Sequence, residues 1–175
     1  MKVILGSAGE KIDGWLSTDI DILDITKLSD WRIHFELDSI NMMLAEHVWE
    51  HLSIKDGILA AENCYKYLRK RGHIRIAVPD GYSPHQDYIE HVKVGECGHM
   101  VLYNHDTLGN MLESVGFVIS KMEYWKEDGT FFTRPWKEED GHIKRSVRND
   151  WRNVDGKVRY TSLIIDAGKG EVNTG

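Results

Sequence analysis

The chain has 175 residues, of which 41% are hydrophobic and 29% charged, and its formal net charge is −6. This length predicts one domain with one core, and the acidic balance gives no strong signal for nucleic-acid binding. No apolar run is long enough to cross a membrane.

Two further features favour a reduced, cytoplasmic setting. The N-terminus lacks the apolar region of a signal peptide. The only two cysteines, Cys64 and Cys97, have no metal-like spacing, and Cys64 falls in a helical pattern as a small core residue.

The first two predicted strands are short, and each is followed by residues typical of a nucleotide site. Residues 2–5 are β-branched and apolar and stop at a glycine-containing turn, residues 6–9. Glycine lets backbone N–H groups approach a ligand closely, but no helical pattern follows this turn. Residues 14–21 predict a second strand that ends in Asp19 and Asp21. Nucleoside binders hold ribose hydroxyls with an acid in this position, although aspartate is also typical of turns and caps.

The central strand is predicted by an uninterrupted apolar run, residues 42–45, which is typical of a strand buried on both faces. Before it, Ile33, Phe35 and Leu37 alternate with polar residues and predict a half-buried extended segment. The apolar run ends in two glutamates and two histidines, Glu46, His47, Glu50 and His51. Open α/β sheets place their sites at the carboxyl ends of strands, so we expect this cluster to face a ligand.

A helix and another strand follow the central strand. Ser53 predicts the helix N-cap, with Asp56 three residues on, and Gly72 is expected to end the helix. Residues 73–78 predict the next strand. This spacing is that of a βαβ unit, which implies parallel strands and a right-handed crossover.

The second half of the chain is less regular. Residues 82–101 form a long irregular stretch, and such loops often cover a site. A further helix is predicted from a cap at Asp106 or Thr107 to Gly116, followed by a strand over residues 117–125.

These elements predict a single domain over residues 1–167. Residues 126–156 are charged and aromatic without clear periodicity, and we expect a surface insertion between the last two strands. The last strand is expected over residues 157–166, and residues 168–175 are expected to form a flexible tail.

In this order the parts resemble class I S-adenosylmethionine-dependent methyltransferases, most closely a small predicted subgroup. The resemblance covers most of the chain except residues 126–153. The matching residues are the glycine turn, Gly14 and Trp15, the acidic second strand, residues 46–52 (Glu-His-Val-Trp-Glu-His-Leu), and the strand ending in Val78, Pro79 and Asp80. The resemblance implies an α/β, Rossmann-like fold with a mostly parallel seven-stranded sheet. Its last strand would run antiparallel between two others, and the first helix would be reduced or missing.

The resemblance also implies S-adenosyl-L-methionine as the cofactor and a role for each matching residue. Gly6, Ser7, Ala8 and Gly9 would lie against the methionine part of the cofactor, Asp19 or Asp21 would bind the ribose hydroxyls, Ile25 and Thr26 would border the adenine, and Glu46 and His47 would face the methyl group and the substrate. The acceptor would be a small molecule or another, unidentified substrate.

The glycine turn departs from the pattern of the family. The full loop is Gly-x-Gly-x-Gly, whereas this chain has Gly-Ser-Ala-Gly with a shortened connection. The alternative to an enzyme is therefore a non-catalytic binding or scaffold protein that keeps the sheet.

Methyl transfer needs a base if the acceptor is a hydroxyl or a protonated amine, and His47, His99 and Tyr103 are the candidates. His47-x-x-Glu50-His51 also matches the inverted zincin motif, and some metal-dependent O-methyltransferases carry Glu-x-x-Glu-His in this place. A divalent ion is therefore an alternative. The simpler expectation is a site without metal, in which Glu50 and His51 brace the junction between strand and helix.

Overall fold

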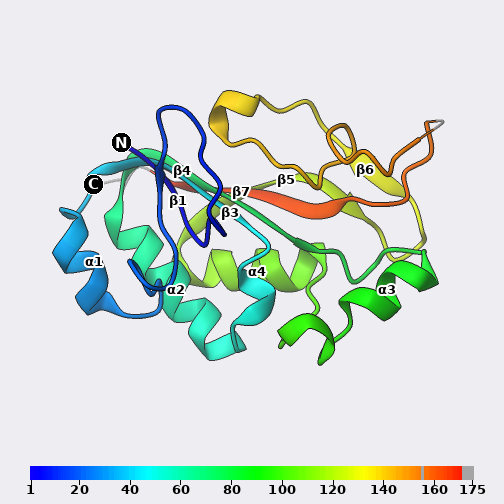
Figure 1. Cartoon of the computed structure of the whole chain (residues 1–175), viewed down its shortest axis with the longest axis horizontal. Coiled ribbons are helices and arrows are strands. Elements are labelled where there is room, and N and C mark those ends of the chain that lie inside the picture. Colours follow the sequence, from blue (N-terminus) through cyan, green and yellow to red (C-terminus); the bar gives the residue numbers. More distant parts are fainter. Residues whose placement is uncertain (155, 171–175) are drawn as a thin grey trace.

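A seven-stranded mixed sheet forms the centre of the molecule in a computed structural model that describes residues 1–154 and 156–170 (Figure 1). The strand order is β2-β1-β3-β4-β7-β5-β6. The strands are β1 Lys2–Ile4, β2 Leu16–Ser17, β3 Ile40–Glu46, β4 Leu68–Pro79, β5 Phe117–Trp125, β6 Phe131–Thr133 and β7 Ser162–Lys169. Strands β1 to β4 pair in parallel, and β7 is antiparallel to both of its neighbours, β4 and β5. The predicted fold is confirmed, and none of the residues between β1 and β2, all of them described, is helical.

The four α-helices of the described residues lie on one side of the sheet, whereas the 3₁₀ turn η3 Glu138–Asp140 lies on the other (Figure 1). The helices are α1 Leu28–His34, α2 Ile54–Tyr67, α3 Gln86–Val92 and α4 His105–Val115, and two further short 3₁₀ turns are η1 Trp49–His51 and η2 Glu96–Gly98. The main apolar core lies between the sheet and α1, α2 and α4, and includes Trp31, Met43 and Leu108. No helix in the described ranges is long and apolar enough to cross a membrane.

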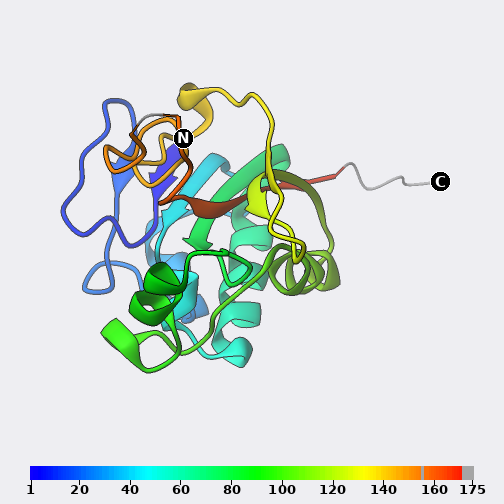
Figure 2. The same cartoon turned by 90° about the vertical axis from the view of Figure 1, so that its right-hand side faces the viewer.

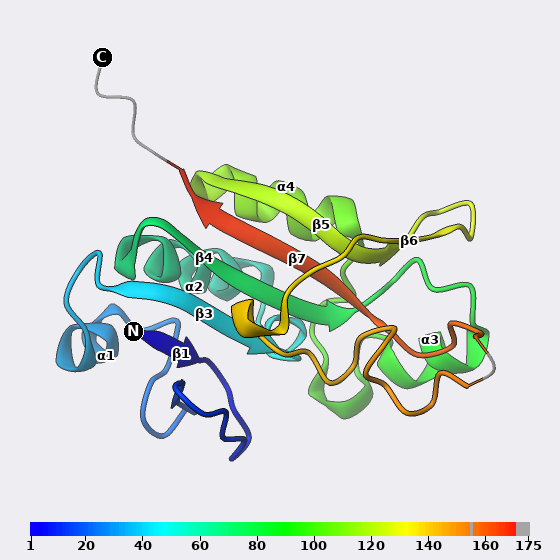
Figure 3. The same ribbon diagram turned by 90° about the horizontal axis from the view of Figure 1, so that it is seen from above.

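The other face of the sheet is covered by coil. Residues 134–154 and 156–161, which we name the returning segment, lie between β6 and β7 in the chain and cross this face (Figure 3). Trp136 and Ile143 of this segment are buried in a second apolar cluster with Ile4 and Leu44. Residues 126–156, expected as a surface insertion, thus contain the hairpin strand β6 and two core residues, while most of their described side chains are exposed or half-buried.

Buried polar side chains hold the returning segment on the sheet. Arg75 of β4 is 1% exposed and forms two parallel bonds of 2.7 Å to Asp166 of β7. Its Nη1 also donates to the carbonyl oxygens of Lys137 (2.9 Å) and Gly141 (2.7 Å). Glu123 of β5, also buried, accepts hydrogen bonds from three positions of the segment. A buried charge needs such partners, so these contacts fix the path of the segment.

The prediction of an extended segment around Ile33, Phe35 and Leu37 is wrong. These residues fall in and just after α1. Ile33 and Leu37 are 76% and 65% exposed, whereas Phe35 is buried beside Trp31, four residues earlier. The buried residues are therefore not the alternating ones. Trp31 and Phe35, four positions apart, form the buried face, as expected for a helix.

The predicted end of α2 at Gly72 is also wrong. Ser53 caps the helix as expected, through the backbone N–H of Asp56, but the helix ends at Tyr67 and β4 follows directly. Gly72 lies beside a shift in the register between β3 and β4, where an added Cβ would be 2.9 Å from the carbonyl oxygens of Arg69 and Asn41. This glycine is explained by close strand packing rather than by a helix end.

Three other boundaries differ from the sequence prediction. Asn104, rather than Asp106 or Thr107, is the N-cap of α4, while Gly116 ends it as expected. The stretch 82–101 contains α3 and η2 and is not irregular throughout. Strand β7 begins and ends three to five residues later than predicted, because it pairs along β4 and β5 as far as Lys169. The first residues of the expected tail are therefore in a strand, and residues 171–175 lie outside the described residues.

Candidate functional site

A cleft of about 920 Å³ opens at the carboxyl ends of β1 and β3. Its walls are the glycine turn after β1, the end of β3 with η1, residues of α3 and η2, and the returning segment. Figure 2 looks onto this end of the sheet, with the blue N-terminal loop beside the orange returning segment. The predicted site residues that line the cleft are Gly6, Ser7, Ala8, Gly9, Glu46, His47 and His99. The predicted site residues outside it are Asp19, Asp21, Ile25, Thr26 and Tyr103.

The glycine turn is closed by bonds within the chain. The N–H of Ser7 donates to the carbonyl of Thr18 at 2.9 Å, and the N–H of Ala8 donates to the carboxylate of Asp19 at 2.8 Å. Gly6 has φ +62°, and an added Cβ would lie 2.7 Å from Cγ2 of Val48. The carboxylate of Asp19 thus stabilises the turn. This is the turn-and-cap role that the sequence left open beside ribose binding.

The residues expected at the adenine lie in another part of the molecule. Ile25 is buried in the main core, and its carbonyl accepts hydrogen bonds from Nε1 of Trp31 and Nδ2 of Asn63, both at 3.0 Å. The hydroxyl of Thr26 donates to Asp24 at 2.6 Å. These two residues therefore stabilise the loop before α1 and do not border the cleft.

Tyr103 also belongs to the main core and is 3% exposed. Burial, with the nearby charge of Glu50, raises the pKa of its phenol to about 12. The geometry therefore does not support Tyr103 as a base, and two of the three candidates, His47 and His99, remain in the cleft.

Glu46 connects the end of β3 to the returning segment. Its Oε1 accepts the N–H of Arg145 at 2.8 Å, and its Oε2 accepts the N–H of Lys144 at 3.1 Å. The ammonium of Lys144 lies 3.0 Å from Glu10, which follows the glycine turn. Both oxygens of Glu46 are therefore engaged in positioning one wall of the cleft against another.

His47 and Glu50 form the floor of the cleft beyond β3. His47 has φ +58°, and its Nε2 is 2.9 Å from the hydroxyl of Ser162. Its Nδ1 is 2.9 Å from Oε1 of Glu50. Glu50 is 1% exposed, and within the described chain neither of its carboxylate oxygens has a hydrogen-bond partner of acceptable geometry. The contact with His47 is thus close but poorly aligned for a hydrogen bond.

His51 and His99 lie beside this carboxylate. Their ring centroids are 5.0 Å apart. His51 is exposed and His99 is 9% exposed. The carbonyl of Glu50 accepts the N–H groups of Met100 (2.7 Å) and Val101 (3.2 Å), so the backbone next to His99 is bound to η1.

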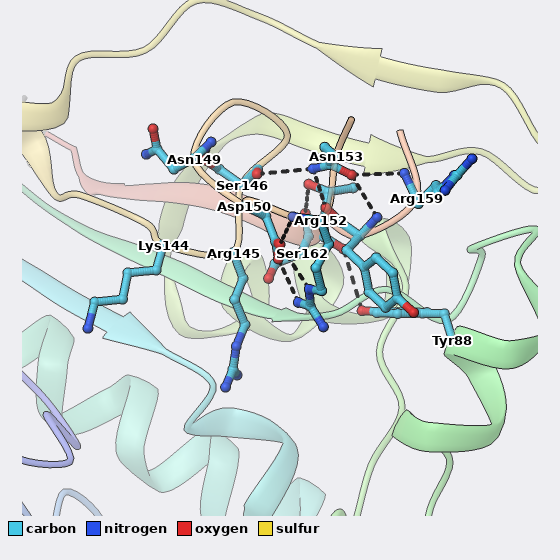
Figure 4. A network of polar contacts seen from close by, with 12 residues as sticks. Tyr88, Lys144, Arg145, Ser146, Asn149, Asp150, Arg152, Asn153, Arg159 and Ser162 are labelled. Atoms are coloured by element: carbon cyan, nitrogen blue, oxygen red, sulfur yellow. Dashed lines mark hydrogen bonds and ion pairs between the residues drawn. The ribbon is translucent and has the colours of Figure 1, made fainter. Parts of the chain in front are cut away.

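The returning segment adds a basic wall that the sequence analysis missed (Figure 4). Arg152 is paired with Asp150 through two bonds of 2.9 and 2.6 Å. Burial acts to raise the pKa of Asp150, but the bonds from Arg152 outweigh it and hold that pKa below its usual value. The side chain of Arg145 extends from the same segment, and Figure 4 draws no hydrogen bond or ion pair from its guanidinium group to the other residues shown. No periodicity marks this segment, and its run of basic residues at 144, 145, 148 and 152 is the only signal that could have pointed to the wall.

Comparisons by sequence give no relatives: no protein-family model matches the chain, and neither does any curated protein. Comparison of the structure does find neighbours. The chain is similar to one in the complex of the Haloferax volcanii Trm112 methyltransferase activator with its methyltransferase (12% identity, TM-score 0.58, covering 99% of this chain and 83% of that one). It is also similar to a SAM-dependent methyltransferase of Archaeoglobus fulgidus (17% identity, TM-score 0.57, covering 96% and 85%).

A third neighbour carries the methyl donor. It is Haemonchus contortus phosphoethanolamine N-methyltransferase 2 in complex with S-adenosyl-L-methionine (11% identity, TM-score 0.53, covering 97% of this chain and 48% of that one). At these identities the likeness concerns the fold, which is that of class I SAM-dependent methyltransferases.

Proposed function

We propose that this protein transfers a methyl group from S-adenosyl-L-methionine to an acceptor bound in the cleft between the glycine turn and the returning segment. The observation that carries the proposal is the position of the cleft, at the carboxyl ends of parallel strands and beside the glycine turn. The fold of the neighbouring methyltransferases supports it.

The cofactor fits the chain in part. The turn from Gly6 to Gly9 lines the cleft and would hold the methionine portion, and the volume of about 920 Å³ leaves room for a nucleoside and an acceptor. An added Cβ at Gly9 would meet nothing within 4 Å, so this side of the turn is open. The nucleoside would be held by other lining residues than Asp19, Ile25 and Thr26.

His47 is the residue we assign as the base. When bound, the cofactor supplies an electrophilic methyl carbon, so the protein contributes mainly placement. His47 lines the cleft, its Nε2 is 2.9 Å from the hydroxyl of Ser162, and the carboxylate of Glu50 lies near its Nδ1. It would accept the proton of a hydroxyl or ammonium acceptor, and the nearby carboxylate of Glu50 would stabilise the resulting imidazolium.

The alternative is a binding protein without catalysis. It is supported by the glycine turn itself, since the amides of Ser7 and Ala8 are already bonded within the chain. Titration calorimetry with S-adenosylhomocysteine separates the two. We expect one binding site per chain; no heat together with no thermal shift would defeat the enzyme proposal.

Two aspartate variants test how the turn contributes. Asp19→Ala is expected to weaken S-adenosylhomocysteine binding by releasing the amide of Ala8, and Asp21→Ala, on an exposed side chain, is the matched control. In an assay with isotopically labelled methyl donor and a panel of acceptors, His47→Ala should lower kcat by roughly 10²–10⁴-fold while cofactor binding is kept.

A further inference from the structure

We propose that Glu50, His51 and His99 bind one divalent first-row transition-metal ion at the floor of the cleft. One candidate ligand atom from each residue lies within 4.8 Å of the other two. All three residues line the cleft, so an ion there would be open to a bound acceptor. The inference concerns metal binding alone and does not depend on methyl transfer.

The carboxylate of Glu50 is the strongest sign of a cation-binding site. It is 1% exposed, and within the described chain both oxygens lack a hydrogen-bond partner. Burying an ionised carboxylate without partners costs several kcal/mol. The neighbouring His47 has its Nε2 bound to Ser162 and only a misaligned contact with Glu50. A metal ion would supply the partner that this carboxylate lacks.

In both histidines Nδ1 faces a backbone carbonyl oxygen, so Nε2 is the ring nitrogen available to a metal ion. Nδ1 of His99 is 2.9 Å from the carbonyl oxygen of Val92, and Nδ1 of His51 is 3.3 Å from that of Gly98. A carbonyl oxygen only accepts hydrogen bonds, so in each ring Nδ1 carries the proton and Nε2 keeps its lone pair. A backbone carbonyl that fixes the tautomer in this way is the usual support of a metal-binding imidazole.

The site is close to binding geometry but not closed. In a four-coordinate zinc site with bonds of about 2.0–2.2 Å, ligand atoms lie roughly 3.3–3.6 Å apart. From the 4.8 Å limit, a contraction of up to roughly 1.2–1.5 Å is therefore needed. His51 is exposed and free to make this movement, while His99 is buried and held next to η1 by the bonds from Met100 and Val101.

The ligand set determines which metal fits. Two imidazole nitrogens and one carboxylate favour Zn²⁺, Co²⁺, Ni²⁺, Fe²⁺ or Mn²⁺ over Mg²⁺ and Ca²⁺, which prefer oxygen ligands. Three protein ligands leave at least one position for water or for an oxygen or nitrogen of the acceptor. The structure also corrects the motif read from the sequence: η1 is a single 3₁₀ turn that begins after His47, so His47 and His51 do not share a helix face, and His99 takes the place of His47.

The test uses full-length protein treated with EDTA, dialysed, and titrated with Co²⁺ and Zn²⁺ in the Cys97→Ser background, which removes an exposed thiol of the cleft. We expect one ion per chain by calorimetry, a visible Co²⁺ absorption band that Zn²⁺ displaces, and a rise in Tm. Glu50→Gln and His99→Ala should each weaken binding by roughly a hundredfold or more. His91→Ala, a histidine of the same cleft outside the cluster, should leave it unchanged.

The Tm of Glu50→Gln also distinguishes loss of metal binding from loss of folding. Because it removes a buried charge that has no hydrogen bond, this variant should have a higher Tm than wild type in EDTA and should lose the metal-induced rise. Absence of a 1:1 site in the wild type, or equal affinity in wild type and Glu50→Gln, would overturn the proposal.

Discussion

Glu46 and Arg145 are joined across 99 positions of the chain: the carboxylate at the end of β3 accepts the backbone N–H of the returning segment at 2.8 Å. The second oxygen of Glu46 accepts the N–H of Lys144. A strand of the sheet and a coil on its face are thus connected beside the cleft through a single side chain.

Glu46→Gln is expected to loosen this connection. The amide keeps one accepting oxygen and loses the other, which should lower the free energy of unfolding by about 1–2 kcal/mol and speed hydrogen exchange at the amides of Lys144 and Arg145. Glu139→Gln, an exposed glutamate of the same segment, is the control. Unchanged exchange at both amides in Glu46→Gln would contradict the contact.

Gly6→Ala should be much more damaging than Gly9→Ala. Both positions have positive φ, +62° and +83°, but only at Gly6 would the added Cβ meet an atom, Cγ2 of Val48 at 2.7 Å. We expect a loss of about 1 kcal/mol at Gly9 from backbone strain and roughly 2–4 kcal/mol at Gly6 from strain and overlap. Urea denaturation measures both.

The cause of the Gly6 effect is open to a direct check. A Gly6→Ala/Val48→Ala double variant removes the overlapping methyl groups, so it should cost less than the sum of the two single variants. Simple additivity would show that strain alone explains Gly6.

Arg75 should be essential for the returning segment. Arg75→Met leaves Asp166 and two carbonyl oxygens without their donor, and we expect a loss of about 3 kcal/mol or more by chemical denaturation. Arg75→Lys should not restore it, since an ammonium cannot form the two parallel bonds.

A double-mutant cycle with Asp166, the ion-pair partner of Arg75, tests the pair itself. Arg75→Met combined with Asp166→Leu removes both charges, so the double variant is expected to be more stable than Arg75→Met alone. A double variant that is less stable would mean that the carbonyl contacts at 137 and 141, and not the ion pair, dominate.

The burial of Asp80 should make the free energy of unfolding depend on pH. It is fully buried, and burial raises its pKa from 3.8 to about 6 despite hydrogen bonds from the N–H groups of Trp125 and Tyr82. The folded state therefore binds the proton more tightly than the unfolded state, so stability falls as the pH rises from about 4 to about 6 and then levels off. The difference corresponds to roughly 3 kcal/mol.

Denaturation curves between pH 4 and 7 measure this effect. Asp80→Asn should remove the corresponding part of the decline, whatever its own cost in stability. Asp21→Asn, on an exposed side chain, should leave the decline as in wild type. An identical slope in wild type and Asp80→Asn would show that Asp80 is ionised without penalty in the folded protein.

The sequence predicted those parts of the fold that are determined by a few neighbouring residues. The apolar run 42–45, the Ser53 cap, Gly116 and the strand Phe117–Trp125 are each determined within a few residues, and the structure confirms them. The sheet order, with an antiparallel strand between two others, came from the resemblance and not from any local pattern.

The returning segment could not be predicted in this way. Its path depends on Arg75 and Glu123, which look like surface residues in the sequence and are each 1% exposed in the fold. The same limit applies to the site. Glu46 and His47 were expected in the cleft because they end a buried strand, whereas the approach of His99 to Glu50 joins segments 49 positions apart and has no signature in spacing.

The amides of Lys144 and Arg145 bind the basic wall to Glu46, and the side chain of Lys144 adds an ion pair with Glu10. Every amino acid except proline has this N–H group, so the contact between position 145 and Glu46 does not depend on the type of residue at 145. Substituting Arg145 would change the charge and size presented to an acceptor while its backbone bond to Glu46 is kept. The chain therefore separates the part of the cleft that selects a substrate from the part that must stay fixed.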